Sequence, residues 1–572
     1  MVTPSLESIF PVSSASHVTR MERWLSSRRL AYGLFALIYI VPTLILAHRK
    51  LMWEDELFTL YLSKIGTWSE LIRALSTGAD QHPPSFYYLT HLIFQLAGTT
   101  HVTLRVAAVA GFGLGCASLY EISRRLVGAK WATSAFIFPL ASGNYYYASE
   151  ARGYGLEVGF ATFALLMWIL AAEGKKRRLT LPGLAFGLCG AVASHYYAVL
   201  IVIPLVVGEL VRTWFRKSVD FAVWVAFAAS AIPLVAFAPV ILKARTYSGH
   251  FWAVPHWGEP LFWYPDALGH LSLLLVATAA VGFLLRLLYA GPDKEEEVAA
   301  SLPISAAIIV WALIPMIGIV LAESVTHAYT GRYFIAALTP VCFLLIFALK
   351  RILPSHSIGA GLVLVLTLGL YAQAWRDQFH TQNTSHETLL SSAALLRSTG
   401  TGPVIVSEAT IFHQISYYAK SDLAERVVYV ADPYLSTNFI GHDTIDRGLL
   451  DLKPWFPLNV VWWHDWWKDH SSSLIYGNVG EWTWITFALP QIADLKISNR
   501  DLSHLMMLAT RLKVPEDDRS ATDPSGKPAL YDQLQRSGHS LCEIYMPTET
   551  CPVVDDPKFR PFIAYPNIPG WH

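Results

Sequence analysis

The chain is short of charge. Of its 572 residues, 15% are charged, whereas a soluble domain carries about 25%. The 43 basic and 43 acidic residues cancel, so no basic excess points to nucleic acid as a partner. Because 53% of the residues are hydrophobic, we expect much of the chain to lie away from water.

Cysteine is scarce too, with five residues in all. Cys116, Cys189 and Cys342 lie in apolar runs, where a thiol acts as a small hydrophobic filler. Cys542 and Cys551 lie in a polar region and could form a disulfide in an oxidising compartment. The His, Asp and Glu residues lack the short, fixed spacing of a structural zinc site, so we expect no structural metal.

A cleavable signal peptide is also not expected. The first apolar run, 31–47, lacks a small-residue cleavage site and is long enough to span a bilayer. Four arginines precede it. We therefore expect a retained first helix, with residues 1–30 in the cytoplasm.

Long apolar runs continue through the first two-thirds of the chain. They lie at 102–122, 131–148, 155–172, 180–194, 198–214, 220–241, 267–289, 302–322, 333–349 and 357–374. Basic residues occupy alternate loops, which the positive-inside rule assigns to the cytoplasm. The loop 290–300 is acidic, but acidic residues contribute little to orientation. We expect a polytopic α-helical membrane protein, with about eleven transmembrane helices in residues 31–376.

The first outer loop, 48–101, contains an apolar segment that we do not count as a span. Pro83–Gly98 begins with two prolines and contains His91 and Gln95. If it crossed the membrane, every later basic loop would lie outside. We expect a helix along the outer interface.

The composition becomes polar from residue 377 onwards, which predicts a small extracytoplasmic α/β domain over 377–572. Strands are expected at 403–407, 426–430, 460–463 and 484–487, with a helix at 412–420. The Trp-rich segment 461–467 is expected to dock this domain on the membrane face, although it could also be a platform on which sugars stack.

Ionisable residues gather in the predicted outer loops and are rare at mid-depth of the helices. They are Asp55, Glu56, Asp80, His82, Glu150, Arg152, His195, His327 and Arg332. A transporter or flippase of lipid-linked sugars, the alternative function, would place paired charges near the midplane. An inactive scaffold would leave the cluster unexplained. The distribution favours an enzyme that acts at one face of the membrane.

This cluster contains the groups that sugar transfer from a lipid-linked phosphate would need. A carboxylate can act as the general base towards an acceptor hydroxyl. The leaving phosphate needs cations, and the guanidinium groups of Arg152 and Arg332 fit phosphate oxygens well. Simpler explanations remain open, since Asp55 and Glu56 could be a solvated loop pair and the arginines could be interfacial anchors.

Five short motifs follow one another in residues 30–350, all on the same predicted side of the membrane. They are Trp53–Phe58, Asp80–Tyr88, Gly98–Arg105, Tyr147–Tyr154 and Gly331–Tyr333. Their order and spacing resemble the GT-C glycosyltransferases, and among these the protein O-mannosyltransferase and aminoarabinose-transferase-like group. Ser85 stands where this group more often has Leu.

The resemblance implies a polyprenyl-phosphate-sugar donor, inversion at the anomeric carbon and no required metal cofactor, although related oligosaccharyltransferases use one. Asp55 matches the catalytic carboxylate of the family and Glu56 its neighbour. Donor phosphate or sugar contacts are expected from Asp80, His82, Glu150, Arg152, Tyr154, His195, Tyr196, Arg332 and Tyr333. The other expected partners are membrane lipid and an acceptor protein, lipid or polysaccharide. A bacterial inner or plasma membrane is the expected location.

Overall fold

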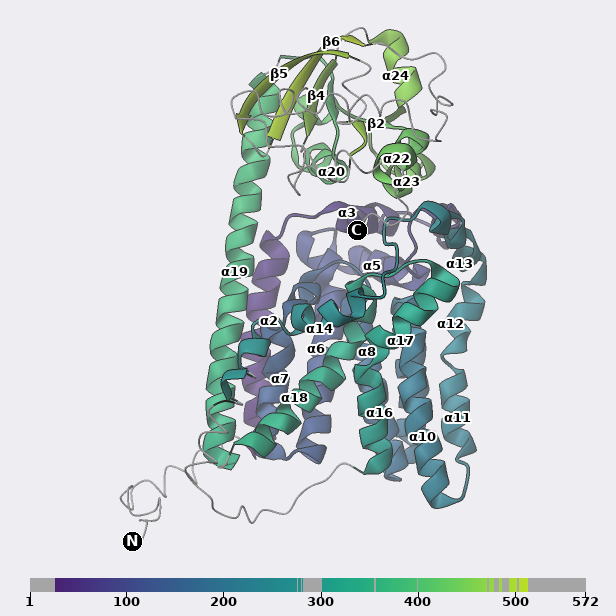
Figure 1. Ribbon diagram of the computed structural model, residues 1–572, viewed down its shortest axis with the longest axis vertical. Coiled ribbons are helices and arrows are strands. Elements are labelled where there is room, and N and C mark those ends of the chain that lie inside the picture. Colours follow the sequence, from purple (N-terminus) through teal and green to yellow (C-terminus); the bar gives the residue numbers. More distant parts are fainter. Residues whose placement is uncertain are drawn as a thin grey trace, which may run out of the picture.

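The computed structural model describes residues 26–512 except 275, 279, 281–300, 354–355, 399, 471–472, 478–482, 486–492 and 502–503. The molecule has two parts stacked along its long axis, a helical body and a smaller part with a sheet (Figure 1). The expectations for the N-terminal residues 1–25, for the loop 290–300 and for Cys542 and Cys551 lie outside the described residues.

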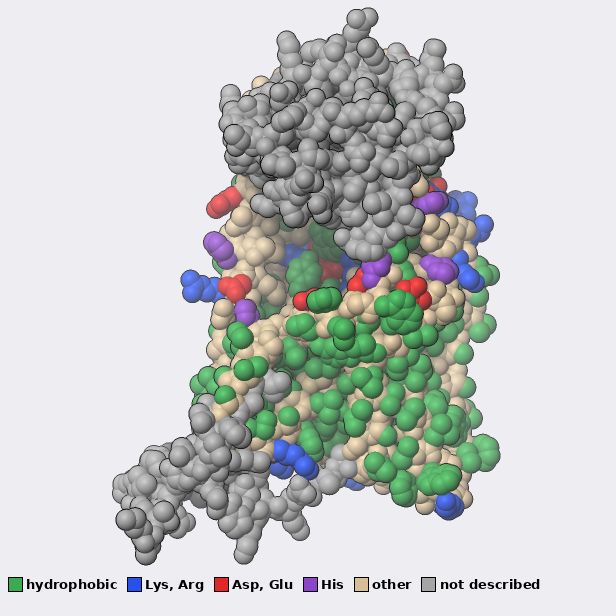
Figure 2. Space-filling view, in the orientation of Figure 1, with side chains coloured by type: hydrophobic (Ala, Val, Ile, Leu, Met, Phe, Trp, Pro, Cys, Tyr) green, Lys and Arg blue, Asp and Glu red, His purple; other side chains and the backbone are tan. Residues whose placement is uncertain are grey.

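The body is built mainly from apolar helices. They are α2 (Arg28–Arg49), α6 (His101–Leu126), α8 (Tyr154–Ala172), α9 (Arg177–Ser194), α10 (Val202–Arg216), α16 (Leu302–Ala312) and α18 (Leu338–Ile352). Within the described ranges, five helical segments are long and apolar enough to cross a membrane, or seven if two bent pairs each count as one span. Their outer surface is largely apolar, with charged side chains near both ends (Figure 2).

The polytopic helical fold is therefore confirmed, whereas the number eleven stays a prediction because residues 281–289 of the run 267–289 are not described. One expected helix, 131–148, is wrong as a continuous span. Here α7 (Ala129–Ile137) gives way to the 3₁₀ turns η2 (Phe138–Ala141) and η3 (Gly143–Ser149). Pro139 lies at this transition, where its ring and missing N–H disfavour a continuing α-helix.

Two other expected spans are bent. In the run 220–241, α11 (Phe221–Ala228) and α12 (Ala231–Ala236) meet α13 (Ala238–Ala244) at a bend of 62°. In the run 302–322, α16 meets α17 (Ile314–Leu321) at a bend of 54°. Each second helix begins with a proline in its first turn, Pro239 and Pro315, the position that proline favours.

The helices α6 and α8 are in close backbone contact. A Cβ atom added to Gly159 would lie 2.2 Å from the carbonyl oxygen of Gly111, and one added to Gly155 would lie 2.4 Å from that of Ala108. Glycine is therefore required along this seam. The contact fixes α8, and with it the turn before Tyr154, relative to the first outer loop.

The first outer loop folds into three short helices at the upper end of the body, α3 (Glu54–Ser63), α4 (Trp68–Leu75) and α5 (Pro84–Ala97) (Figure 1). The first turn of α3 contains three consecutive acidic residues, Glu54, Asp55 and Glu56, which the helix dipole favours at this end. The helix expected at 83–98 is present as α5, which starts at Pro84.

The upper part contains a six-stranded sheet in the order β3-β2-β1-β4-β6-β5. The strands are β1 (Val404–Val406), β2 (Val427–Ala431), β3 (Val460–Trp462), β4 (Ser473–Gly477), β5 (Ala493–Asp501) and β6 (His504–Leu512). The first four are parallel, and β6 pairs antiparallel with β4 and β5. Strands occur where 403–407, 426–430 and 460–463 predicted them. At 484–487, Trp484 and Ile485 are not in a strand, and the other two residues are not described.

Five helices accompany this sheet. They are α20 (Ala409–Tyr418), α21 (Ser421–Ala424), α22 (Pro433–Ile440), α23 (Thr444–Leu452) and α24 (Trp463–Asp469). The helix expected at 412–420 overlaps α20. The expected docking of 461–467 on the membrane is wrong, since α24 lies away from the helical body (Figure 1). Trp463 is buried against Trp484, with ring centroids 4.8 Å apart, so it stabilises the sheet part itself.

A single 43-residue helix, α19 (His356–Ser398), joins the two parts along one side of the molecule (Figure 1). At about 1.5 Å per residue such a helix is about 65 Å long. The change in composition at residue 377 therefore falls inside a continuous helix and is not a structural boundary. No proline lies between Pro354 and Pro403, so nothing in the sequence breaks the helix there.

We expect Gly159→Ala to lower the melting temperature of the detergent-solubilised protein by several degrees. The new methyl group would force α6 and α8 apart, and overpacking of this kind costs about 1–3 kcal/mol. Gly33→Ala in α2 is the matched control, because a Cβ there meets nothing within 4 Å. Equal melting temperatures for the two variants would contradict the close contact.

Candidate functional site

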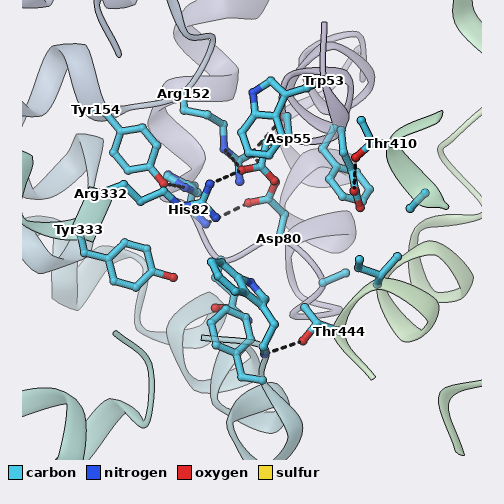
Figure 3. A pocket seen from close by; sticks show the side chains of 18 of the residues that line it. Trp53, Asp55, Asp80, His82, Arg152, Tyr154, Arg332, Tyr333, Thr410 and Thr444 are labelled. Carbon is cyan, nitrogen blue, oxygen red and sulfur yellow. Dashed lines mark hydrogen bonds and ion pairs between the residues drawn. The ribbon is translucent and has the colours of Figure 1, made fainter. Parts of the chain in front are cut away.

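A pocket of about 390 Å³ lies between the upper end of the helical body and the sheet part, within the range of about 300–1,000 Å³ for small-molecule sites. The body contributes Trp53, Glu54, Asp55, Phe58, Asp80, His82, Arg152, Tyr154, Trp252, Arg332 and Tyr333. The sheet part contributes Glu408, Ala409, Thr410, Thr444 and Ile445. The pocket is therefore lined by both parts (Figure 3).

Asp55 lies between two arginines. Its Oδ2 atom is 3.1 Å from Nη1 of Arg332 and 3.8 Å from Nε of Arg152. Arg332 is in the 3₁₀ turn η7 (Gly331–Ala337), and Arg152 is in the turn before α8. Arg332 also lies over the rings of Trp53 and Trp252, at 5.7 and 5.2 Å from their centroids. These contacts place two positive charges and one carboxylate at the same point in the pocket.

Arg152 is held by a second carboxylate. Its Nη1 is 2.8 Å from Oδ2 of Asp80. The other oxygen of Asp80 accepts hydrogen bonds from the Tyr87 hydroxyl at 2.6 Å and from the backbone N–H of His82 at 3.1 Å. Because Asp80 is only 4% exposed and fully bonded, it acts as a fixed support for Arg152.

His82 belongs to an aromatic group behind the arginines. Its Nε2 is 3.4 Å from the Tyr154 hydroxyl, and its ring centroid is 5.3 Å from that of His195. Its buried Nδ1 has no hydrogen-bond partner among the described residues. Burial lowers the pKa of His82 well below its usual range, and the nearby Arg152 adds to this effect. A neutral imidazole can exchange hydrogen bonds with a ligand but adds no charge.

The comparison with known proteins covers both sequence and fold. Residues 81–242 match the family model described as dolichyl-phosphate-mannose-protein mannosyltransferase. The structure of ArnT from Cupriavidus metallidurans bound to undecaprenyl phosphate is similar, with 12% identity and a TM-score of 0.52 over 86% of this chain and 100% of that chain. The apo structure of ArnT from the same organism gives 13% identity and a TM-score of 0.53 over 85% and 99%. A search of curated protein sequences gave no match.

The chain has the GT-C fold. Together with the family match, this fold indicates a glycosyltransferase. The resemblance to GT-C glycosyltransferases inferred from the sequence motifs is therefore confirmed. In the part of the GT-C chain that the structure describes, no group of three or more His, Cys, Asp or Glu residues is arranged to hold a metal ion.

The structure brings most of the expected site residues of the GT-C body to one pocket. Those that line it are Asp55, Asp80, His82, Arg152, Tyr154, Arg332 and Tyr333. The expected residues that do not line it are Glu56, Glu150, His195 and Tyr196. Of these, His195 lies behind the pocket, with its ring 5.1 Å from that of Tyr333 and its Nδ1 3.5 Å from a carboxylate oxygen of Glu157.

Glu56, which we expected in the catalytic pair, faces away from the pocket. Its two oxygens accept hydrogen bonds from Nε and Nη2 of Arg105 at 2.8 and 2.6 Å, and the backbone N–H of Ala151 adds a third at 2.8 Å. Both charged side chains are fully buried. Since this carboxylate has no access to a substrate, we assign Glu56 a positioning role.

Glu150 is likewise buried beside the site. Neither of its carboxyl oxygens has a hydrogen-bond partner among the described residues. Burial raises the pKa of Glu150 to about 7, against the opposing effect of Lys50. Glu150 does not line the pocket, so its expected contact with the donor stays a prediction.

The sequence analysis assigned no role to several pocket residues. Trp53 and Glu54 belong to the first motif, so the sequence could have indicated them as residues of the site. Trp252 lies in a loop rich in His, Trp and Pro. Glu408, Thr410 and Thr444 come from the sheet part, and nothing in their local sequence marks them as lining a site.

The sheet part also holds the chain that leads to Asp55. The hydroxyl of Tyr418 accepts a hydrogen bond from the backbone N–H of Met52 at 2.8 Å, and the amide of Gln414 donates to the Met52 carbonyl at 3.1 Å. Both side chains come from α20. The first turn of α3 is thus fixed from above by the sheet part and from below by Arg105.

Glu56→Gln is expected to destabilise the protein much more than Asp55→Asn. Breaking a buried ion pair on one side leaves the other charge uncompensated, at a cost of about 3–5 kcal/mol. Asp55 lies at the pocket, where its side chain is 17% exposed and water can replace lost contacts. Melting temperatures of both variants in detergent would measure the difference. A larger loss for Asp55→Asn would refute the positioning role of Glu56.

Glu150→Gln is expected to raise the melting temperature at pH 8, with a gain that shrinks towards pH 5. The pKa of Glu150 rises from an ordinary value of 4.5 to about 7 in the folded protein. The native state therefore holds this proton more tightly, and its stability falls as the pH rises through this interval. Glu387→Gln, at an exposed position of α19, is the control and should show no such trend. A gain that is independent of pH would count against the raised pKa.

Proposed function

We propose that this protein transfers a sugar from a polyprenyl-phosphate donor to an acceptor hydroxyl, with inversion and on the extracytoplasmic side of the membrane. The observation that carries the proposal is the position of Asp55 between Arg332 and Arg152 in a pocket at one end of the helices. A carboxylate beside two guanidinium groups provides both a base and a binding site for a phosphate.

In the proposed step, Asp55 accepts the proton of the acceptor hydroxyl. The oxygen of that hydroxyl attacks the anomeric carbon of the sugar at the same time. The new carbon–oxygen bond forms as the bond from that carbon to the phosphate oxygen breaks. The bonding pair leaves with the polyprenyl phosphate, whose negative charge is met by the arginines. Attack from the face opposite the phosphate inverts the anomeric carbon.

The arginines are suited to receive the phosphate. The Nε atoms of Arg152 and Arg332 are buried and have no hydrogen-bond partner among the described residues. Arg152 stays anchored on Asp80, whereas Arg332 bonds to Asp55 itself. We infer that the donor phosphate draws Arg332 away from Asp55 and so frees the carboxylate to act as a base. The step uses no metal ion, and turnover is expected to persist in EDTA.

The lipid part of the donor is inferred from ArnT, whose structure with undecaprenyl phosphate shares this fold. The polyprenyl chain would lie along the apolar surface of the helices below the pocket. The orientation follows from the basic residues at the opposite end of the body, including Lys175, Arg177 and Lys350. This orientation would place the pocket and the sheet part outside a bacterial inner or plasma membrane.

Asp55→Asn is expected to lower donor turnover at least about a hundredfold, because the amide cannot take the acceptor proton. Membranes containing equal amounts of wild type or variant would be given a panel of polyprenyl-phosphate sugars, and released polyprenyl phosphate would be measured. Asp377→Asn, an exposed position on α19, serves as the matched control and should keep full activity.

Equal turnover by Asp55→Asn and wild type would remove Asp55 as the base. Turnover of no donor by the wild type, combined with movement of lipid-linked sugar across vesicle membranes, would favour a flippase instead.

A further inference from the structure

The two sides of the pocket differ in charge. Within the described residues, the cations that line it are Arg152 and Arg332, both on the side of the helical body. On the side opposite the arginines lie Thr410 and Thr444 of the sheet part (Figure 3). Glu408 of the same part also lines the pocket, and Glu54 of α3 accepts a hydrogen bond from Thr410. A donor phosphate fits the first side, so the second side is left for the other substrate.

Glu408 is the N-cap residue of α20, yet its side chain makes no capping hydrogen bond. Glu408 is one of the residues that line the pocket. The amino end of the 10-residue helix favours a negative charge at this position. Thr410, two residues further on, donates a hydrogen bond from Oγ1 to Oε2 of Glu54 at 3.4 Å. This contact joins the two parts of the molecule across the pocket.

These carboxyl groups have little compensation from neighbouring cations. Burial, together with the neighbouring carboxylates of Asp55 and Glu408, raises the pKa of Glu54 to about 8. Burial also raises the pKa of Glu408 to about 7. A ligand that donates hydrogen bonds or carries a positive charge would stabilise both carboxylates. An anionic group beside them would disfavour their ionised forms still further.

We propose that Glu54, Glu408 and Thr410 form the acceptor subsite, and that it takes an uncharged or cationic acceptor whose hydroxyl or amino groups donate hydrogen bonds, not a phosphorylated one. The inference rests on the proposed glycosyl transfer. An acceptor held there has its reacting hydroxyl next to Asp55, which follows Glu54 in the first turn of α3. Trp252 and Phe58 complete the lining with apolar surface, against which the carbon skeleton of a sugar or amino sugar can pack.

Glu408→Lys places a cation in this subsite and tests the chemical class of the acceptor. Membranes would receive the labelled polyprenyl-phosphate sugar that the wild type turns over, and label attached to endogenous acceptors would be counted. We expect at least a tenfold loss of transfer. Binding of undecaprenyl phosphate to the purified full-length variant, followed by tryptophan fluorescence, should stay within twofold of the wild type. Glu408→Gln should give a smaller loss of transfer.

Glu425→Lys is the matched control, since Glu425 is exposed on the same part of the chain and lies outside the pocket lining. It should transfer label as the wild type does. Increased transfer by Glu408→Lys would mean a phosphorylated acceptor, and unchanged transfer would mean that Glu408 does not contact the acceptor. A parallel loss of undecaprenyl phosphate binding would assign Glu408 to the donor. Each of these results overturns the proposal. A wild type that turns over no donor would instead refute the underlying glycosyl transfer, and the acceptor subsite with it.

Discussion

The buried ion pair between Glu56 and Arg105 is the constraint on which the site depends. Arg105 also donates to the backbone carbonyls of Ala47 and Lys50 at 2.6 and 2.9 Å. One guanidinium therefore ties the end of α2, the start of α3 and α6 together. Two charges without water are stable only when their hydrogen bonds are satisfied, so this geometry tolerates little movement. Because consecutive residues of a helix point in different directions, anchoring Glu56 inward turns Asp55 towards the pocket.

The charged side chains of the pocket are linked to one another through shared ion-pair partners. Asp80 holds Arg152, and Asp55 lies near both arginines. Each arginine thus has a carboxylate partner in a site that is largely shielded from water. In the proposed reaction, an entering phosphate would compete with Asp55 for Arg332, while the Asp80 contact would keep Arg152 in place. Binding of the donor and exposure of the base would then be one event.

The sequence was sufficient to predict the helical membrane fold, because long apolar runs and alternating basic loops are properties of the chain itself. The motifs also identified seven of the residues that line the pocket. They named Asp55 as the base but also placed Glu56 in the catalytic set, since the direction of the Glu56 side chain depends on Arg105, which is 49 residues away. The break after α7 and the continuity of α19 were missed because composition alone does not report helix ends. Glu408 could not be found, because a pocket between two distant segments leaves no local pattern.

The sheet part lines the pocket and also packs against the helix that carries Asp55. Through Tyr418 and Gln414 it satisfies both backbone groups of Met52, one residue before the N-cap of α3. The ring of Phe58 in α3 lies 5.1 Å from that of Phe456 and 5.3 Å from that of His413. The helix that carries Asp55 is therefore packed between two separately built halves of the molecule. Neither half alone provides a complete pocket, because the cations come from the helices and Glu408 comes from the sheet part. Geometry and charge thus make the two parts a single functional unit.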